Sequence, residues 1–238
     1  MTGNIFRTAL TCLALAAIAA ADDTVLTGTV VDAEGKPVEG VEIGDNWQLG
    51  KETKAYSGIK TAADGTFSLT LHYFRPPVAL LAMDDKRERG AAVLVQEADA
   101  AKPVALTLSP LATVRGELAC SDKEISPAGA SVQWQFGKAR IGNLHAVEAK
   151  WETKLPPGAW GFWVFHMDLS NFAKNFDVAA DGKELDLGTL EVAPAKLATL
   201  RGKDFPKWHV SDARGVGKTV QPGDYKGKWL LVEFWGFW

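Results

Sequence analysis

The chain has 238 residues and a formal net charge of −3, with 47% hydrophobic and 23% charged residues. This balance is typical of a globular protein and excludes a disordered chain, while the lack of a basic cluster excludes a nucleic-acid-binding protein. Its cysteines are Cys12 and Cys120, which exclude a disulfide framework and a cysteine-based metal cluster. The four histidines are scattered without metal-ligand spacing, so we predict neither a metal nor a cofactor.

The N-terminus has the pattern of a secretory signal peptide. Arg7 supplies the positive charge, residues 9–20 form an apolar run, and small residues over 17–21 fit a cleavage site. The run is shorter than the roughly 20 residues that a membrane-spanning helix needs. We therefore predict a signal peptide over residues 1–21, no permanent membrane span, and export to the periplasm, the cell envelope or the extracellular space.

Residues 22–110 have the pattern of a β-sandwich. Apolar and polar side chains alternate over residues 25–31, a turn follows at Gly35 to Pro37, and the dipeptide Asp64-Gly65 precedes another alternating run. The charged run over residues 84–89 is expected to be a solvated loop. We predict a first β module with these bounds.

Two runs in this module carry a family resemblance. They are Gly28-Thr29-Val30-Val31-Asp32-x-x-Gly35-Lys36-Pro37-Val38-x-Gly40-Val41 and Thr61-x-x-Asp64-Gly65-x-Phe67. Together they resemble a carboxypeptidase regulatory-like (transthyretin-like) β-sandwich. The resemblance implies an accessory module without catalytic residues of its own.

Residues 111–195 show a weaker form of the same pattern. The run Thr113-Val114-Arg115-Gly116-Glu117-Leu118 is similar to residues 26–30, and Asp181-Gly182 marks a hairpin. We predict a second, Ig-like β-sandwich, interpreted as a divergent repeat of the first. Cys120 lies after one of its strands and is expected to be buried and unreactive.

Tryptophans are concentrated in this second module. In a strand, Trp160 and Phe162 share one face while Trp163 and Phe165 share the other. Both faces are apolar, which favours core packing on both sides of the strand. The alternative is an aromatic platform in which Trp160 or Trp163 stacks on the rings of a glycan.

Residues 196–238 follow a linker at Ala193 to Lys196. The run from Trp229 to Trp235 is apolar except for Glu233, and glycines enclose it. This pattern predicts a fully buried central strand.

The end of the chain resembles a known family. Gly227-Lys228, the apolar run and Phe234-Trp235-Gly236-Phe237-Trp238 are similar to the start of a secreted thioredoxin-like (TlpA/redoxin-like) thiol–disulfide oxidoreductase, where a Cys-x-x-Cys motif comes next. The resemblance implies a thioredoxin-like domain truncated before its motif. Trp235 and Trp238 would flank the active site, and the redox cysteines would lie beyond Trp238. No catalytic residue is then present, and the chain as given is predicted to be inactive.

The predicted fold is mainly β, with two tandem β-sandwich modules and the first strands of an incomplete α/β thioredoxin-like domain. The predicted function is thiol–disulfide exchange on protein thiols and disulfides in the full-length form. The alternative is a non-enzymatic binding or scaffold protein of the cell envelope, whose sandwiches hold a glycan or another envelope partner.

Overall fold

The computed structural model describes residues 23–50, 52–72, 74–146, 148–204, 207–231 and 233. The predicted signal peptide and the tryptophans Trp235 and Trp238 lie outside the described residues. The elements of the described part are 17 strands and three short 3-10 helices. The prediction of a mainly β fold is confirmed. No helix in the described ranges is long and apolar enough to span a membrane.

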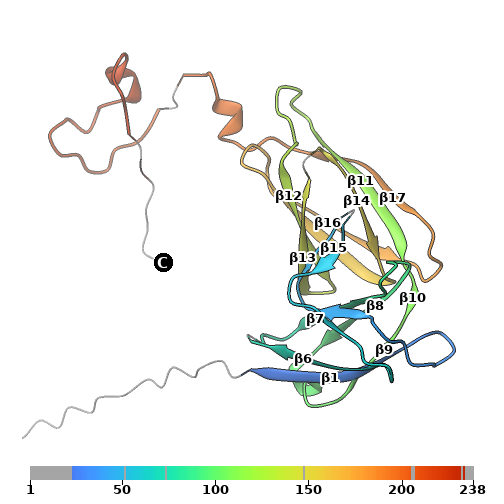
Figure 1. Cartoon of the computed structure of the whole chain (residues 1–238). Helices are drawn as coiled ribbons and strands as arrows, with labels where there is room; N and C mark the ends of the chain where they lie inside the picture. The colour runs from blue at the N-terminus through green and yellow to red at the C-terminus, as the bar shows by residue number, and fades with distance from the viewer. Residues whose placement is uncertain are drawn as a thin grey trace, which may run out of the picture.

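Two sheets form the first module, drawn at the bottom of Figure 1. The three-stranded sheet contains β6 (Thr66–Leu71), β1 (Thr24–Val31) and β9 (Val104–Thr107), in this order. The five-stranded sheet contains β10 (Ser109–Pro110), β8 (Arg89–Val95), β7 (Val78–Met83), β2 (Glu42–Gly44) and β5 (Ile59–Lys60). The 3-10 helix η1 (Glu97–Asp99) follows β8. Inward side chains of both sheets, such as Leu26, Phe67 and Leu80, form one buried cluster.

Two further sheets form the second module. The three-stranded sheet contains β14 (Lys150–Leu155), β11 (Ala112–Cys120) and β17 (Leu185–Val192). The six-stranded sheet contains β16 (Phe172–Val178), β15 (Gly158–Phe165), β12 (Ala130–Phe136), β13 (Ala139–Ala146), β3 (Trp47–Gln48) and β4 (Lys54–Ala55). The last two strands come from residues that precede this module in the chain.

Both modules use the same strand connectivity. β1 pairs antiparallel with β6 and parallel with β9, and β11 pairs antiparallel with β14 and parallel with β17. The order β8-β7-β2-β5 in one module matches β16-β15-β12-β13 in the other. An aromatic ring also lies over a glycine at the same place in each: Phe67 covers Gly28, and Trp151 covers Gly116. The module boundaries at 110/111 and 195/196 stay predictions.

The β3–β4 hairpin joins the two modules. β3 pairs parallel with β13, with Trp47 opposite Gly142, and the Leu49 N–H donates to the Asn143 carbonyl at 2.9 Å. A Cβ at Gly142 would lie 2.1 Å from the Trp47 carbonyl oxygen, so glycine is required for this approach. The Trp47 side chain is fully buried, and its indole N–H donates to the Gly44 carbonyl at 3.0 Å.

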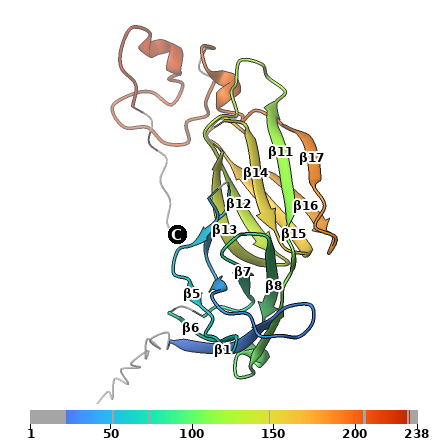
Figure 2. The same cartoon turned by 45° about the vertical axis from the view of Figure 1, so that its right-hand side comes forward.

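β7 contributes to both hydrophobic cores. Leu80 and Ala82 face the core of the first module, whereas Ala79, Leu81 and Met83 belong to the cluster built mainly from the second module. All five side chains are fully buried. A continuous apolar run is typical of a strand covered on both faces, and Figure 2 shows β7 and β8 directly below the sheets of the second module. The two modules therefore share a core.

Arg87 covers the polar edge of this junction. Its guanidinium lies 5.5 Å from the centre of the Trp47 ring, pairs with the Glu42 carboxylate, and donates to the Thr53 carbonyl at 3.1 Å. The Arg87 carbonyl in turn accepts from Lys154 of the second module at 2.8 Å. The expectation of a solvated loop over residues 84–89 holds for Asp85, Lys86 and Glu88, which are exposed. It was wrong for Asp84 and Arg87, which are buried or partly buried and form ion pairs with Arg89 and Glu42.

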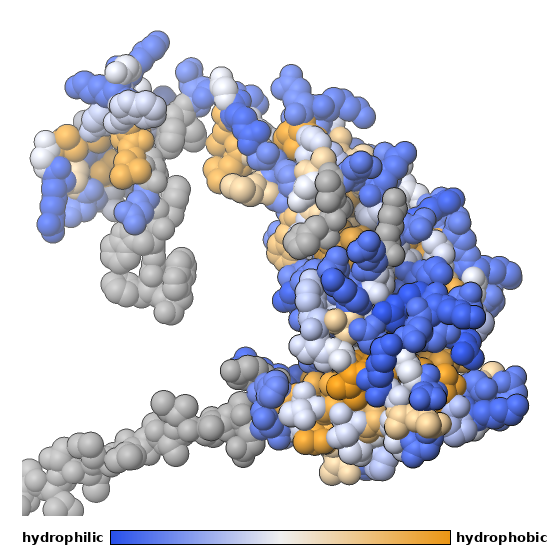
Figure 3. Space-filling view, viewed as in Figure 1, coloured by the Kyte–Doolittle hydropathy of each residue, from blue (hydrophilic) through white to orange (hydrophobic). Residues whose placement is uncertain are grey.

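The C-terminal segment does not form the predicted domain. Its elements in the described residues after 195 are the 3-10 helices η2 (Ala198–Leu200) and η3 (Pro222–Tyr225), with no strand and no α-helix. In the described part of the predicted strand, Trp229 is 103% and Leu231 91% exposed, and Figure 3 shows apolar side chains at the surface of this segment. The thioredoxin-like part of the predicted fold was wrong, because an apolar run forms a buried strand only beside strands that pair with it, and this segment has none in its described residues.

Replacing Trp47 tests the shared core. We expect Trp47→Ala to lower the free energy of unfolding by about 3–5 kcal/mol, because the change leaves a cavity between two modules. Urea unfolding measures this loss. Tyr56→Ala in the exposed loop after β4 is the matched control and should change the value by less than about 0.5 kcal/mol. Equal effects of the two variants would show that Trp47 does not hold the modules together.

The turn between β7 and β8 depends on the ionised form of Asp84. Burial raises the pKa of Asp84, but hydrogen bonds from the N–H groups of Glu88 and Arg89 and from the Arg89 side chain lower it by more. The pKa of this carboxyl therefore lies below its ordinary value of 3.8.

A lowered pKa makes the contribution of Asp84 to stability depend on pH. The ionised group stabilises the fold above the ordinary value of 3.8, and this contribution is lost as the pH falls through the lower pKa of the folded state. We expect Asp84→Asn to cost stability at about pH 5 and much less at about pH 2. Urea unfolding at both pH values measures the difference. A cost independent of pH would contradict the assignment; Asp85→Asn, at an exposed carboxylate paired with Lys60, serves as the control.

Candidate functional site

The six-stranded sheet carries the candidate site on the face turned away from its core. Alternation along β12 buries Val132 and Trp134 and leaves Gln133 and Gln135 on the opposite side. We call the surface formed by the outward side chains of β12, β15 and β16 the outer face.

β15 divides its aromatic side chains between the two faces of the sheet. Trp160 and Phe162 are buried in the core, whereas Trp163 is 38% and Phe165 49% exposed on the outer face. The packing interpretation therefore fits Trp160, whose indole N–H donates to the Pro156 carbonyl at 2.9 Å. The expectation that the strand is buried on both sides was wrong, because the core covers this sheet on one face.

The core behind the outer face is densely aromatic. The Trp134 ring lies 5.2 Å from the Trp151 and Phe162 rings, with edge-on or tilted geometry, and 6.2 Å from Phe176. Such ring pairs add stabilisation beyond their buried area. The indole N–H groups of Trp134 and Trp151 are buried without a hydrogen-bond partner among the described residues, which costs about 1–3 kcal/mol each. The aromatic packing must offset this cost, and it gives the outer face a rigid support.

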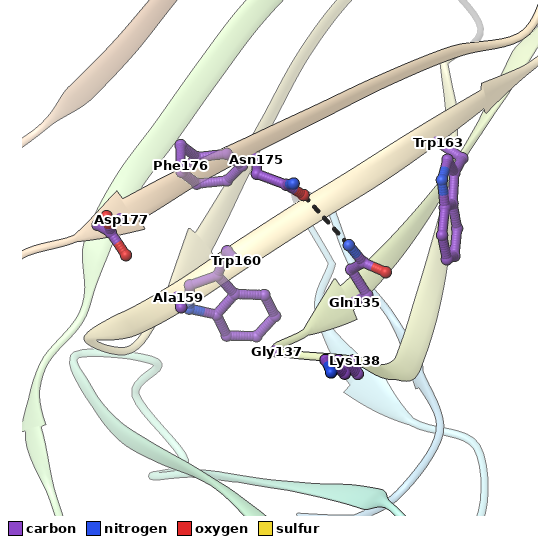
Figure 4. Close-up of a pocket in the computed structure, with 9 residues that line it drawn as sticks. All are labelled: Gln135, Gly137, Lys138, Ala159, Trp160, Trp163, Asn175, Phe176 and Asp177. Atoms are coloured by element: carbon purple, nitrogen blue, oxygen red, sulfur yellow. Dashed lines mark hydrogen bonds between the residues drawn. The ribbon is translucent and has the colours of Figure 1, made fainter.

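A first hollow lies on the outer face at one side of Trp163 (Figure 4). Its volume is about 720 Å³, and its larger side chains are Gln135, Lys138, Trp160, Trp163, Asn175, Phe176 and Asp177. The amides of Gln135 and Asn175 point toward each other, and Gln135 Nε2 donates to Asn175 Oδ1 at 3.2 Å. We call this contact the amide bridge.

Gly161 makes the amide bridge possible. It is the Cα partner of both Gln135 and Asn175 in the sheet. A Cβ at this position would lie 2.3 Å from Asn175 Oδ1 and 2.6 Å from Gln135 Nε2. The two amides thus occupy the space that a side chain at position 161 would fill.

A second hollow lies on the other side of Trp163 and has a volume of about 530 Å³. Trp163, Phe165 and Phe172 supply its aromatic lining, and Gln133 and Asn171 supply two more amides. Of the residues that the structure describes, no charged one lines this hollow. Trp163 therefore lies between two hollows that both combine aromatic rings with primary amides, and the first also contains Lys138 and Asp177.

A third hollow, of about 520 Å³, lies over β11, β14 and β17. Its cations are paired: Arg115 contacts Glu184 at 2.8 Å and Asp186 at 3.0 Å, and Lys150 lies 3.9 Å from Glu117. A hydrogen bond from the Gly188 N–H, followed by one from Arg115, holds the pKa of Asp186 below its ordinary value. Exposed ion pairs of this kind contribute little free energy, and we interpret the group as a solvated face.

The site residues expected from the sequence do not come together in one site of the structure. Trp235 and Trp238 lie outside the described residues, while Cys120 is a free, buried cysteine, as predicted. Within the described ranges, no group of three or more histidine, cysteine or carboxylate side chains could hold a metal ion. Of the two tryptophans considered for a platform, Trp163 is the one on the outer face. Its amide neighbours were missed, although the alternation of residues 131–135 indicates which of them point outward.

No family model matches the chain, and no curated protein matches it. Solved structures that resemble it in part include a Streptococcal ancillary pilin, with 10% identity, a TM-score of 0.33 and coverage of 73% of this chain and 63% of that one. The Bacillus anthracis TIE protein has 9% identity and a TM-score of 0.30 over 73% of this chain and 34% of that one. The shaft pilin SpaA from Lactobacillus rhamnosus GG has 8% identity and a TM-score of 0.29 over 73% and 98%. The chain thus spans less than two thirds of the first two proteins, and likenesses this low identify neither a family nor a function.

The family assignment made from the sequence was wrong. It expected a thioredoxin-like oxidoreductase, or redoxin, preceded by a carboxypeptidase regulatory-like domain. No family model matches, and the described residues contain no α/β domain. The predicted thiol–disulfide exchange therefore has no support in the fold of the described residues.

Proposed function

We propose that this chain is a non-enzymatic binding and scaffold protein of the cell envelope. Its two β-sandwich modules, over residues 22–110 and 111–195, act as one body and hold the outer face toward a partner. The observation that carries this proposal is the pair of exposed aromatic side chains, Trp163 and Phe165, beside amides on a sheet with a rigid core. Exposed aromatic side chains rimmed by polar groups are typical of binding surfaces.

The shared core supports the scaffold part of the proposal. The outer face belongs to the sheet that also contains the β3–β4 hairpin of the first module. A force that a partner exerts on this sheet would therefore act on the first module through Trp47 and β7. Export is supported by Arg7 and the apolar run over residues 9–20, which have the pattern of a signal peptide.

Binding to isolated cell envelopes tests the proposal. The purified protein is mixed with envelopes of the organism that produces it, and the bound fraction is measured after sedimentation. We expect saturable binding that falls at least about tenfold in the double variant Trp163→Ala and Phe165→Ala, because aromatic side chains supply most of the binding free energy at such surfaces.

Tyr56→Ala removes an exposed aromatic side chain from the first module and is the matched control. It should bind as the unchanged protein does. Absence of saturable binding would contradict the proposed function, and so would equal binding by the double variant and the control.

A further inference from the structure

We infer that the outer face holds a binding site for a neutral oligosaccharide, which runs along β15 from one hollow to the other past Trp163. This inference rests on the proposed binding function and names its ligand class. It is carried by the aromatic side chains, the free hydrogen-bonding groups of the amides, and the charge of the two hollows.

The indole of Trp163 supplies the stacking surface. A sugar ring has an apolar face of C–H groups and a rim of hydroxyl groups, so it suits a site with an aromatic ring and a few placed polar groups. Trp163 is 38% exposed, and its Cα partners in the neighbouring strands are Gln133 and Ala173. On one side of the indole, the small side chain of Ala173 leaves room for a ligand. On the other side, the amide of Gln133 is available for hydrogen bonding.

The amide bridge presents unused hydrogen-bonding groups to the first hollow. Of the primary amides of Gln135 and Asn175, one N–H and one carbonyl oxygen are used in the bridge. Among the described residues, the Asn175 amide nitrogen and the Gln135 carbonyl oxygen have no partner, which leaves donors and an acceptor free. A hydroxyl group both donates and accepts hydrogen bonds, so adjacent sugar hydroxyls match this set.

The second hollow repeats this chemistry along the strands. Gln133 and Gln135 are two residues apart on β12, so they are separated by about 6.6 Å. Asn171 and Asn175 accompany them on the side of β16. This spacing is close to the size of one sugar ring, and successive rings of an oligosaccharide can therefore meet successive amides.

The charge of the hollows favours a neutral ligand. The first hollow contains one cation and one anion, Lys138 and Asp177, and the second contains neither. An acidic polymer would gain no net attraction here, since opposite charges cancel. The neutral sugar is also favoured over a protein partner, because both hollows pair aromatic rings with primary amides.

Titration with defined oligosaccharides tests the inference. The probes are hexamers of glucose, xylose, mannose and N-acetylglucosamine, with a hexamer of galacturonic acid as the acidic comparison. Calorimetry measures affinity, and NMR follows the indole N–H signals. We expect at least one neutral hexamer to bind more tightly than the acidic one and to shift the signal of Trp163 but not that of the buried Trp47, which lines neither hollow.

Two variants separate stacking from hydrogen bonding. Trp163→Ala should weaken binding of that hexamer at least about tenfold. Gly161→Ala should also weaken it, because the added methyl group displaces the ends of two flexible amide side chains while the backbone stays unstrained. Tyr56→Ala should have no effect, and circular dichroism should show the same fold for all variants.

Several results would overturn the inference: no binding of any neutral hexamer, equal binding of the acidic hexamer, or binding that survives both Trp163→Ala and Gly161→Ala. The proposed function can stand when the inference fails. In that case, envelopes treated with protease would lose their affinity for the protein, whereas envelopes treated with glycosidases would keep it. Loss of affinity after glycosidase treatment alone agrees with a glycan ligand.

Discussion

The structure depends on the burial of one short hairpin and one strand between two β-sandwiches. Trp47 lies on the β3–β4 hairpin of the first module, and its side chain packs in the core of the second module. β7 packs against hydrophobic side chains on both of its faces. Burying an aromatic side chain and an apolar strand in this way contributes several kcal/mol. Since side chains of the first module complete the core of the second, the two sandwiches are expected to behave as one cooperative unit.

This constraint explains why the outer face can be a precise surface. Its backbone is held from behind by Trp134, Trp151, Phe162 and Phe176, and at its edge by the hairpin. Side chains on such a sheet lose little conformational freedom when a ligand binds, so less of the binding energy is spent on ordering them. Gly161 determines the shape of this surface, because its lack of a side chain lets the amides of Gln135 and Asn175 meet over β15.

The sequence predicts the parts of the fold that depend on local patterns. Alternation and the Asp64-Gly65 turn correctly indicate β1 and β6. The alternating residues 131–135 lie within β12. The sequence does not predict that β3 pairs with β13, because two residues carry no pattern that identifies a partner nearly a hundred positions away. The prediction of a buried strand from the apolar run after Trp229 failed for a related reason. Hydrophobicity indicates a preference for burial, but it does not show that strands are present to pair with. Trp163 was recognised as a candidate, yet its exposure depends on which side of the sheet the core covers.

Native-state hydrogen exchange measures the central claim most directly, since it reports the free energy of opening for each module in the unchanged protein. The amides in the β1–β6 ladder represent the first module, and those in the β11–β14 ladder represent the second. A shared core predicts that the most protected amides of both ladders open with the same free energy and the same dependence on denaturant. If one ladder opens at a clearly lower free energy while the other stays protected, the modules are independent and the account is contradicted.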